Sequence, residues 1–152
     1  MIDKEAEILS NYQLMDLTKK LKLKVNIICK DELINCNNDY LLYIINLSNT
    51  GTKGTHWITL TINNNKAYYY DSFGRKPIKE IKYFCKIHKL KLKYNKFIHQ
   101  DINDNSCGWY CLFHILTLIY NKFNFNKTLE LLNNNDNNNK TIELFFDKLF
   151  KI

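Results

Sequence analysis

The chain has 152 residues, of which 45% are hydrophobic and 24% are charged. This length fits one domain with a core of its own, and the hydrophobic share excludes a disordered tail. No apolar run reaches the roughly 18 residues of a membrane span, and the acidic start MIDKEAEIL is unlike a secretion signal. We therefore expect a single domain over residues 1–152 that has no contact with a membrane and is not secreted.

The net charge is +7, from 22 basic and 15 acidic side chains, and Arg75 is the one arginine among the bases. A basic surface attracts polyanions, which leaves DNA open as a partner. Abundant Lys, Asn and Ile together are also typical of chains encoded by AT-rich genomes. Five cysteines without a secretion signal indicate reduced thiols, and without two CxxC motifs we expect no structural zinc site.

The first half of the chain predicts one helix followed by strands. Leucines at helical spacing predict a helix over about 4–22, and a short strand follows at 25–28. KDELI at 30–34 indicates a turn or a short helix. The apolar run at 39–47 predicts a buried strand. Alternating side chains at 57–62 and 66–71, joined by the turn sequence NNN, predict a hairpin.

The second half predicts mainly helices. Pro77 opens a helix whose apolar face includes Ile81 and Phe84. A strand is predicted at 94–100, and the helix predicted at 107–123 is apolar on most sides and therefore central. The Asn-rich stretch at 133–139 indicates a loop, and an amphipathic helix ends the chain. The sum is an α+β fold, with a mostly antiparallel sheet of four or five strands flanked by helices.

Four residues together have the chemistry of a thiol protease: His56, Asp71, Gln100 and Cys107. Such an enzyme needs a thiolate nucleophile and a histidine that moves its proton. It also needs a carboxylate that orients the histidine and a donor for the oxyanion. Each residue alone has an ordinary structural explanation, so the hypothesis depends on their joint placement.

The predicted elements bring these residues together. Cys107 would begin the central helix, whose free N–H groups lower the pKa of a thiol. His56 would start one strand of the hairpin and Asp71 would end the other, at the same edge of the sheet. Gln100 would end a later strand, where its amide can donate to an oxyanion together with the Cys107 N–H. Gly108 leaves room for a substrate backbone.

Other residues invite competing interpretations. Cys111 lies one turn after Cys107 and is expected in the core rather than as the nucleophile. His99 is a rival base, but it lacks an acid on a neighbouring strand. His99 and His114 lack the acid that would complete a metal site with these cysteines, so no metal is expected. The lysines at 82–93 are either a solvated helix face or a polyanion contact.

The series GTHWITL, AYYYDSFG, and Gln followed after six residues by CGWYC resembles the adenain-like family, the adenovirus maturation proteases. That family belongs to the clan of the SUMO-deconjugating proteases. The resemblance is strongest from about residue 40 to 114. The separation of seven from Gln100 to Cys107, with Ser106 where SUMO proteases have Asp, favours the viral branch.

The resemblance implies a cysteine endopeptidase with the nucleophile at the N-terminus of a buried helix. By position, it implies Cys107 as nucleophile, His56 as base, Asp71 as its partner acid and Gln100 in the oxyanion hole, and Trp57, Gly108 and Trp109 as substrate-binding residues. It implies a monomeric viral maturation protease that cleaves capsid or core precursor proteins at Gly-Gly-like or Gly-Xaa sites. The expected setting is the virion and the infected host cell.

The resemblance implies no cofactor, and it leaves DNA or a peptide open as activators. Two other functions stay open from the sequence. One is a deconjugating protease that acts on ubiquitin-like modifiers, and the other is a catalytically idle relative that binds nucleic acid. The intact set of four residues argues against the idle relative.

Overall fold

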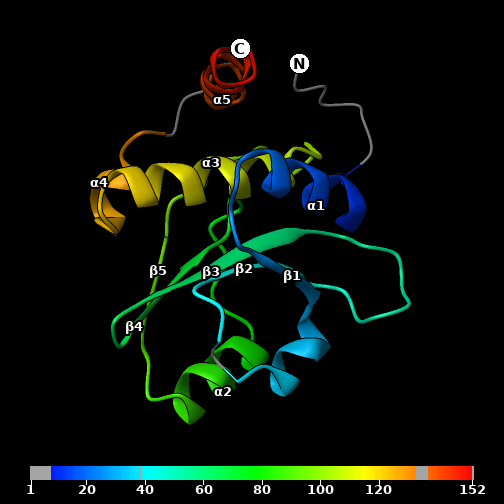
Figure 1. The fold of residues 1–152 in the computed structure, drawn as a ribbon, viewed down its shortest axis with the longest axis vertical. Coiled ribbons are helices and arrows are strands. Elements are labelled where there is room, and N and C mark those ends of the chain that lie inside the picture. The colour runs from blue at the N-terminus through cyan, green and yellow to red at the C-terminus, as the bar shows by residue number, and fades with distance from the viewer. Residues whose placement is uncertain (1–7, 38, 133–136, 152) are drawn as a thin grey trace.

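The computed structural model describes residues 8–37, 39–132 and 137–151, and within these ranges five strands form one mixed sheet (Figure 1). The strands, in their order across the sheet, are β1 (Asn26–Cys29), β2 (Leu42–Asn46), β3 (Trp57–Asn63), β4 (Lys66–Tyr70) and β5 (Lys91–Tyr94). β2, β3 and β4 pair antiparallel, whereas β1 pairs parallel to β2 and β5 parallel to β4. The antiparallel centre was predicted. The two parallel outer pairs were not, because they depend on where the crossovers run.

Helices cover both faces of the sheet (Figure 1). They are α1 (Asn11–Lys20), the 3-10 helix η1 (Lys30–Asn35), α2 (Lys79–Ile87), α3 (Cys107–Tyr120), α4 (Phe125–Leu129) and α5 (Asn138–Leu149). α1, α3, α4 and α5 lie on one side, and α2 and η1 lie on the other. None of the helices in the described ranges is long and apolar enough to cross a membrane.

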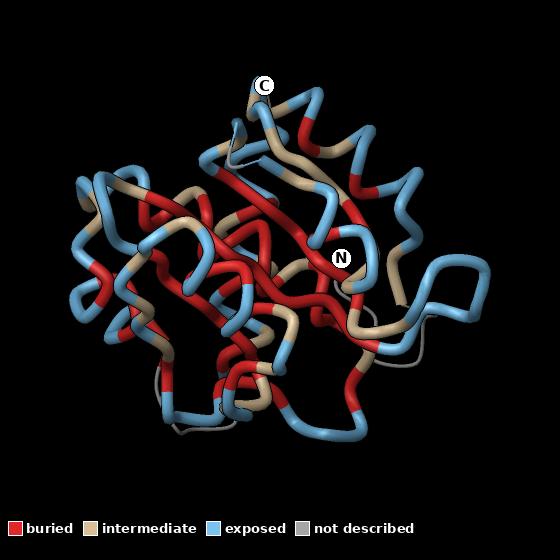
Figure 2. Tube along the Cα trace, turned by 90° about the horizontal axis from the view of Figure 1, so that it is seen from below, coloured by how far each residue is buried: buried red, intermediate tan, exposed pale blue. Residues whose placement is uncertain are grey.

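Two hydrophobic clusters hold the layers together. Successive side chains of a strand point to opposite faces, so Ile44 and Tyr70 join the cluster under α3 while Ile45 and Tyr69 join the cluster above α2. Every residue of β2 is buried, which explains why the strand is apolar from Leu42 to Ile45, before the buried Asn46. Figure 2 shows the buried segments running through the middle of the molecule.

α3 is the buried central helix that the sequence predicted. Ten of its 14 residues are buried, and the helix packs against β3. It begins at Cys107 and ends at Tyr120, three residues before the predicted end. The candidate nucleophile therefore sits at the N-terminal end of the central helix.

The strand predicted at 94–100 is wrong, because β5 ends at Tyr94 and the chain continues as a loop. The Asn95 side chain explains the end of the strand. Its Oδ1 accepts from the Asp71 N–H at 2.9 Å, and its Nδ2 donates to the Asp71 carbonyl at 2.7 Å. The Asn95 side chain thus occupies the Asp71 N–H and carbonyl, with which the backbone would pair if β5 continued. Gln100 consequently lies in a loop, not at a strand end.

The boundaries of the terminal helices also differ from prediction. α1 begins at Asn11, because Ser10 and Gln13 form a reciprocal capping box. Residues 4–7 of the predicted helix lie outside the described residues. α5 begins at Asn138, so the end of the loop predicted at 133–139 is helical, and 133–136 lie outside the described residues. The short helix α4 was not predicted.

Candidate active site

His56 and Asp71 meet at the open end of the β3–β4 hairpin, as the sequence predicted. His56 directly precedes β3 and Asp71 directly follows β4. His56 Nε2 lies 2.7 Å from Asp71 Oδ1, and both side chains are buried. A carboxylate can only accept, so Nε2 carries the hydrogen and Nδ1 of the neutral ring is the unprotonated nitrogen. The pair therefore presents a proton acceptor on the side of the ring that faces away from Asp71.

Phe73 holds this pair in place from the following turn. Its ring stacks on the His56 ring with centroids 4.3 Å apart and planes 13° from parallel. Its backbone N–H donates to Asp71 Oδ1 at 2.8 Å. The other carboxylate oxygen, Oδ2, is buried and has no hydrogen-bond partner among the described residues. One residue thus fixes both the imidazole plane and the carboxylate.

Cys107 is the first residue of α3, and its side chain is almost completely buried, at 1% exposure. Burial raises the pKa of the Cys107 thiol to about 11, although backbone N–H groups of Trp57, Gly108 and Cys107 itself lower it. The lowered pKa expected for a helix N-terminus is therefore not found in this closed arrangement, because loss of water outweighs the N–H groups. The Trp57 backbone, next to His56, contributes to the surroundings of the thiol.

Gln100 is held by three contacts in the loop after β5. Its Oε1 accepts from the Ser72 hydroxyl, and its backbone N–H donates to the Ser72 carbonyl at 3.0 Å. Its Nε2 donates to the Asp104 carbonyl at 2.7 Å. The Gln100 side chain is thus fixed between the turn that carries Asp71 and the loop that leads to Cys107.

A close backbone approach joins these two segments. The His99 N–H donates to the Ser72 carbonyl at 2.9 Å. Gly74 has φ of +70°, and a Cβ there would lie 3.0 Å from the Phe97 carbonyl oxygen. Glycine is therefore required at this turn, both for its φ and for the space it leaves.

The three predicted substrate-binding residues lie in different surroundings. The Trp57 indole N–H donates to the Leu9 carbonyl at 2.7 Å. A Cβ on Gly108 would lie 2.9 Å from Leu9 Cδ1. The Trp109 ring packs edge-on against Phe146 of α5, with centroids 5.0 Å apart. The space beside Trp57 and Gly108 is therefore occupied by Leu9 of the same chain.

A cleft of about 670 Å³ opens beside Leu9 and Trp57. Residues 8–11, the loop at 50–54, Trp57 and Asn105 line it. Asn46 braces the loop, since its Oδ1 accepts from the Thr55 N–H at 3.3 Å and a Cβ on Gly54 would lie 2.8 Å from its Nδ2. The cleft thus runs from the loop before His56 to the loop before Cys107.

The competing candidates lie in the core. Cys111 is 1% exposed, and burial raises the pKa of its thiol well above the ordinary value. His99 Nδ1 lies 2.8 Å from the Tyr70 hydroxyl, and burial lowers the pKa of His99 to about 4. Burial, and then the neighbouring His99, lowers the pKa of His114 to about 3. Neither histidine contacts a carboxylate in the part of the chain that the structure describes.

All five cysteines are free thiols. Among the described residues, no group of three or more His, Cys, Asp or Glu side chains is placed to hold a metal ion.

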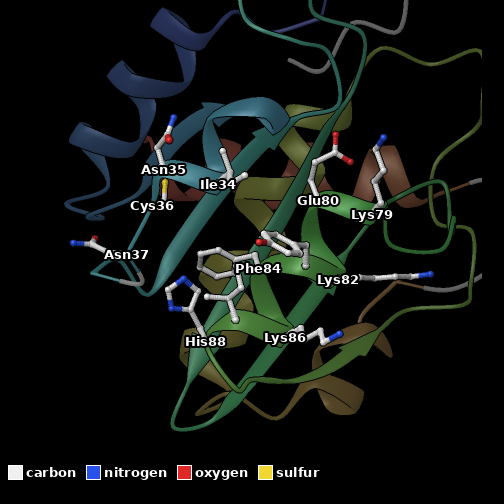
Figure 3. Close-up of a pocket in the computed structure, with 12 residues that line it drawn as sticks. Ile34, Asn35, Cys36, Asn37, Lys79, Glu80, Lys82, Phe84, Lys86 and His88 are labelled. Atoms are coloured by element: carbon white, nitrogen blue, oxygen red, sulfur yellow. The ribbon is translucent and has the colours of Figure 1, made fainter.

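A second hollow, of about 750 Å³, lies on the other side of the sheet between η1 and α2 (Figure 3). Ile34 and Phe84 line its apolar part, and Lys79, Lys82 and Lys86 of α2 stand along it. It contains none of the predicted site residues. The His56–Asp71 pair lies instead at the open end of the β3–β4 hairpin, and Cys107 lies at the start of α3.

Sequence reasoning missed several residues that support the site. Phe73 and Asn95 act through contacts with Asp71, and no local pattern marks them. Asp104 did have a signal: an Asp two residues before a Ser at a helix start is typical of a side chain that bonds the backbone ahead of it. Its Oδ1 accepts from the Ser106 N–H at 3.1 Å.

No family model matches the sequence. A protein of Acanthamoeba polyphaga mimivirus that carries the name "Putative thiol protease" is 35% identical over 92 residues. The matched region is 53% of this chain and 30% of the mimivirus protein, so the chain matches less than a third of that relative's length.

Two crystal structures of a protease of African swine fever virus share the fold. Their TM-scores are 0.61 and 0.60, at 15% sequence identity. Each comparison covers 98% of this chain, and 70% and 69% of the solved chains. This chain therefore shares the fold of these viral proteases. The α+β fold class expected from the sequence is thereby confirmed. The expected resemblance to viral proteases is confirmed as well, since one viral relative carries the name of a thiol protease and the solved viral proteases share the fold.

Proposed function

We propose that this protein is a cysteine endopeptidase with Cys107 as its nucleophile. The observation that carries the proposal is the buried His56–Asp71 pair, whose side chains lie 2.7 Å apart. The residue after His56 is Trp57, and its backbone N–H is part of the surroundings of the Cys107 thiol. The kinship with a protein named as a thiol protease supports the same reaction. A paired histidine beside a thiol at a helix start suits nucleophilic catalysis.

In the proposed reaction, His56 Nδ1 takes the thiol proton as Cys107 Sγ attacks the peptide carbonyl carbon. The tetrahedral intermediate collapses, the C–N bond breaks, and His56 gives the proton to the leaving amine. Water, deprotonated by His56, then hydrolyses the acyl-enzyme and regenerates the thiol. Asp71 keeps the ring in one tautomer and stabilises the imidazolium.

The oxyanion would be bound by Gln100 and the Cys107 backbone N–H. An amide nitrogen carries two hydrogens, and the Asp104 carbonyl takes one from Gln100 Nε2. The second hydrogen is the one proposed to donate to the oxyanion. Ser72 and Asp104 orient the amide before substrate arrives, which is how such a donor becomes effective.

The proposed substrates are viral structural precursor proteins, cleaved at Gly-Gly-like or Gly-Xaa sites in the virion and the infected cell. Kinship with viral proteases supports the setting. The close approach of Leu9 to Gly108, where a Cβ would lie 2.9 Å from Leu9 Cδ1, supports small side chains next to the scissile bond. The net charge of +7 supports DNA as an activator, whose effect would fade steeply with added salt.

The proposal is tested by reacting the protein with iodoacetamide and with a Gly-Gly vinyl sulfone at pH 7, and reading the modified peptide by mass spectrometry. We expect the vinyl sulfone to modify Cys107 and to fail with His56→Ala. Cys111→Ser is the matched control and should react as the wild type does. Labelling spread over Cys29, Cys36 and Cys85, insensitive to His56→Ala, would contradict the assignment.

A further inference from the structure

The first turn of α5 is fastened to the loop that joins Gln100 to Cys107. Asn138 Nδ2 donates to the His99 carbonyl at 2.9 Å. Asn139 Nδ2 donates to Asp104 Oδ2 at 2.7 Å, and Asn139 Oδ1 accepts from the Tyr110 hydroxyl. The loop is therefore held by a helix that begins more than 30 positions later in the chain.

Asp104 is the centre of this arrangement. Its carbonyl accepts from Gln100 Nε2 at 2.7 Å. Its carboxylate Oδ1 accepts from the Ser106 N–H at 3.1 Å and from the Ser106 hydroxyl at 2.7 Å, and Oδ2 accepts from Asn139. With 4% of its surface exposed, Asp104 is a buried carboxylate with hydrogen bonds to both oxygens. One residue thus contacts the oxyanion-hole side chain and the residue before the nucleophile.

We propose that Asp104 and Asn139 are positioning residues of the oxyanion hole. Their hydrogen bond holds the Asp104 carbonyl where it directs the Gln100 amide, and holds Ser106 where it sets the direction of the Cys107 N–H. The inference rests on the proposed protease function. Its physical basis is that catalytic groups must be placed accurately, since a misplacement of about 1 Å can lower the rate roughly 100-fold.

Exchanging the Asp104 and Asn139 side chains distinguishes a positioning role from a purely stabilising one. Asp104→Asn sets an amide against the Asn139 amide, and Asn139→Asp sets a carboxylate against Asp104, so each single variant loses the bond. In the double variant Asp104→Asn/Asn139→Asp, the amide at 104 can donate to the carboxylate at 139. That carboxylate still accepts from Tyr110, and the amide oxygen at 104 still accepts from Ser106.

The experiment compares two reactions of Cys107 in each variant. Alkylation by iodoacetamide needs the thiolate but no oxyanion hole, whereas hydrolysis of a Gly-Gly aminocoumarin amide needs both. We expect each single variant to lose about 10- to 100-fold in kcat, with little change in KM and in the alkylation rate. The double variant should recover most of the loss. Asn126→Asp, the same change in α4, is the matched control and should hydrolyse as the wild type does.

The outcomes are distinct. Single variants that hydrolyse as fast as the wild type overturn the inference. So does a double variant that keeps a wild-type thermal midpoint yet stays as slow as the single variants. A parallel loss of alkylation and hydrolysis would show that the two residues support α3 as a whole and not the oxyanion hole. A wild type that neither hydrolyses the amide nor reacts selectively at Cys107 would instead overturn the protease function, and this inference with it.

Discussion

Asp71 Oδ1 contacts both His56 and Phe73: it lies 2.7 Å from His56 Nε2 and accepts a hydrogen bond from the Phe73 N–H at 2.8 Å. The histidine and the aspartate lie 15 positions apart, on the two arms of one hairpin. Because the Phe73 ring also stacks on the imidazole, the turn after β4 determines the position, plane and tautomer of the candidate base.

Asp71→Asn should remove the acceptor that keeps the hydrogen on His56 Nε2. By analogy with catalytic triads, we expect kcat for peptide hydrolysis to fall by about 10³- to 10⁴-fold. The measurement is steady-state hydrolysis of the Gly-Gly aminocoumarin amide. Asp101→Asn, at an exposed position of the loop before Cys107, is the control and should retain activity. An active Asp71→Asn enzyme would remove Asp71 from the mechanism.

Phe73→Leu should leave His56 free to rotate about its bond to the Cβ atom while keeping the backbone N–H that donates to Asp71. Loss of ring orientation is expected to lower kcat by about tenfold, within the range that misplaced catalytic groups cost. Phe97→Leu is the control, since Phe97 is 60% exposed. Equal rates for the two variants would mean that stacking does not orient the base.

Leu9→Ala should expose the candidate nucleophile. Leu9 packs over Gly108, and its carbonyl accepts from the Trp57 indole, next to a thiol that is 1% exposed. With a smaller side chain, we expect faster alkylation of Cys107 by iodoacetamide. Leu17→Ala is the control, because Leu17 packs against the same cluster from within α1. A faster reaction of both variants would indicate general loosening instead.

Leu9→Ala should also shift the pH dependence of the alkylation of Cys107. Burial raises the pKa of the Cys107 thiol to about 11, so the closed wild-type form is protonated at neutral pH. The thiolate reacts, so the wild-type rate should rise up to about pH 11. Leu9→Ala lets water reach the thiol, which lowers its pKa and moves the rise to lower pH. An unchanged pH–rate profile would show that Leu9 does not shield the Cys107 thiol from water.

His114→Phe should make the protein more resistant to acid. Burial lowers the pKa of His114 from 6.5 to about 3, so below pH 6.5 the unfolded chain binds more protons than the folded one. Folding stability is therefore lost as the pH falls from 6.5 towards 3. Phenylalanine can keep the stacking on Tyr70 and has no ring nitrogen to protonate.

The measurement is urea unfolding of both proteins at pH 7 and pH 4.5. We expect the loss of stability between these values to be smaller for His114→Phe. His88→Phe is the control, since His88 is partly exposed at the end of α2. Equal acid sensitivity of His114→Phe and the wild type would assign the acid transition to other groups, His99 among them.

The sequence by itself determined the pairing of His56 with Asp71 and the burial of the helix that begins at Cys107. Both follow from local periodicity, because alternation specifies a hairpin and a helix apolar on most sides must be central. The hairpin then places its two ends together whatever the rest of the chain does.

Only the tertiary structure decided how Gln100, Asp104 and Leu9 take part. Asn95 ends β5 and puts Gln100 in a loop, Asn139 reaches Asp104 across 35 positions, and Leu9 lies over Gly108. These are contacts between single side chains and distant backbone, which leave no periodic pattern in a sequence. The high pKa of Cys107 has the same origin, since burial depends on every segment that covers the thiol.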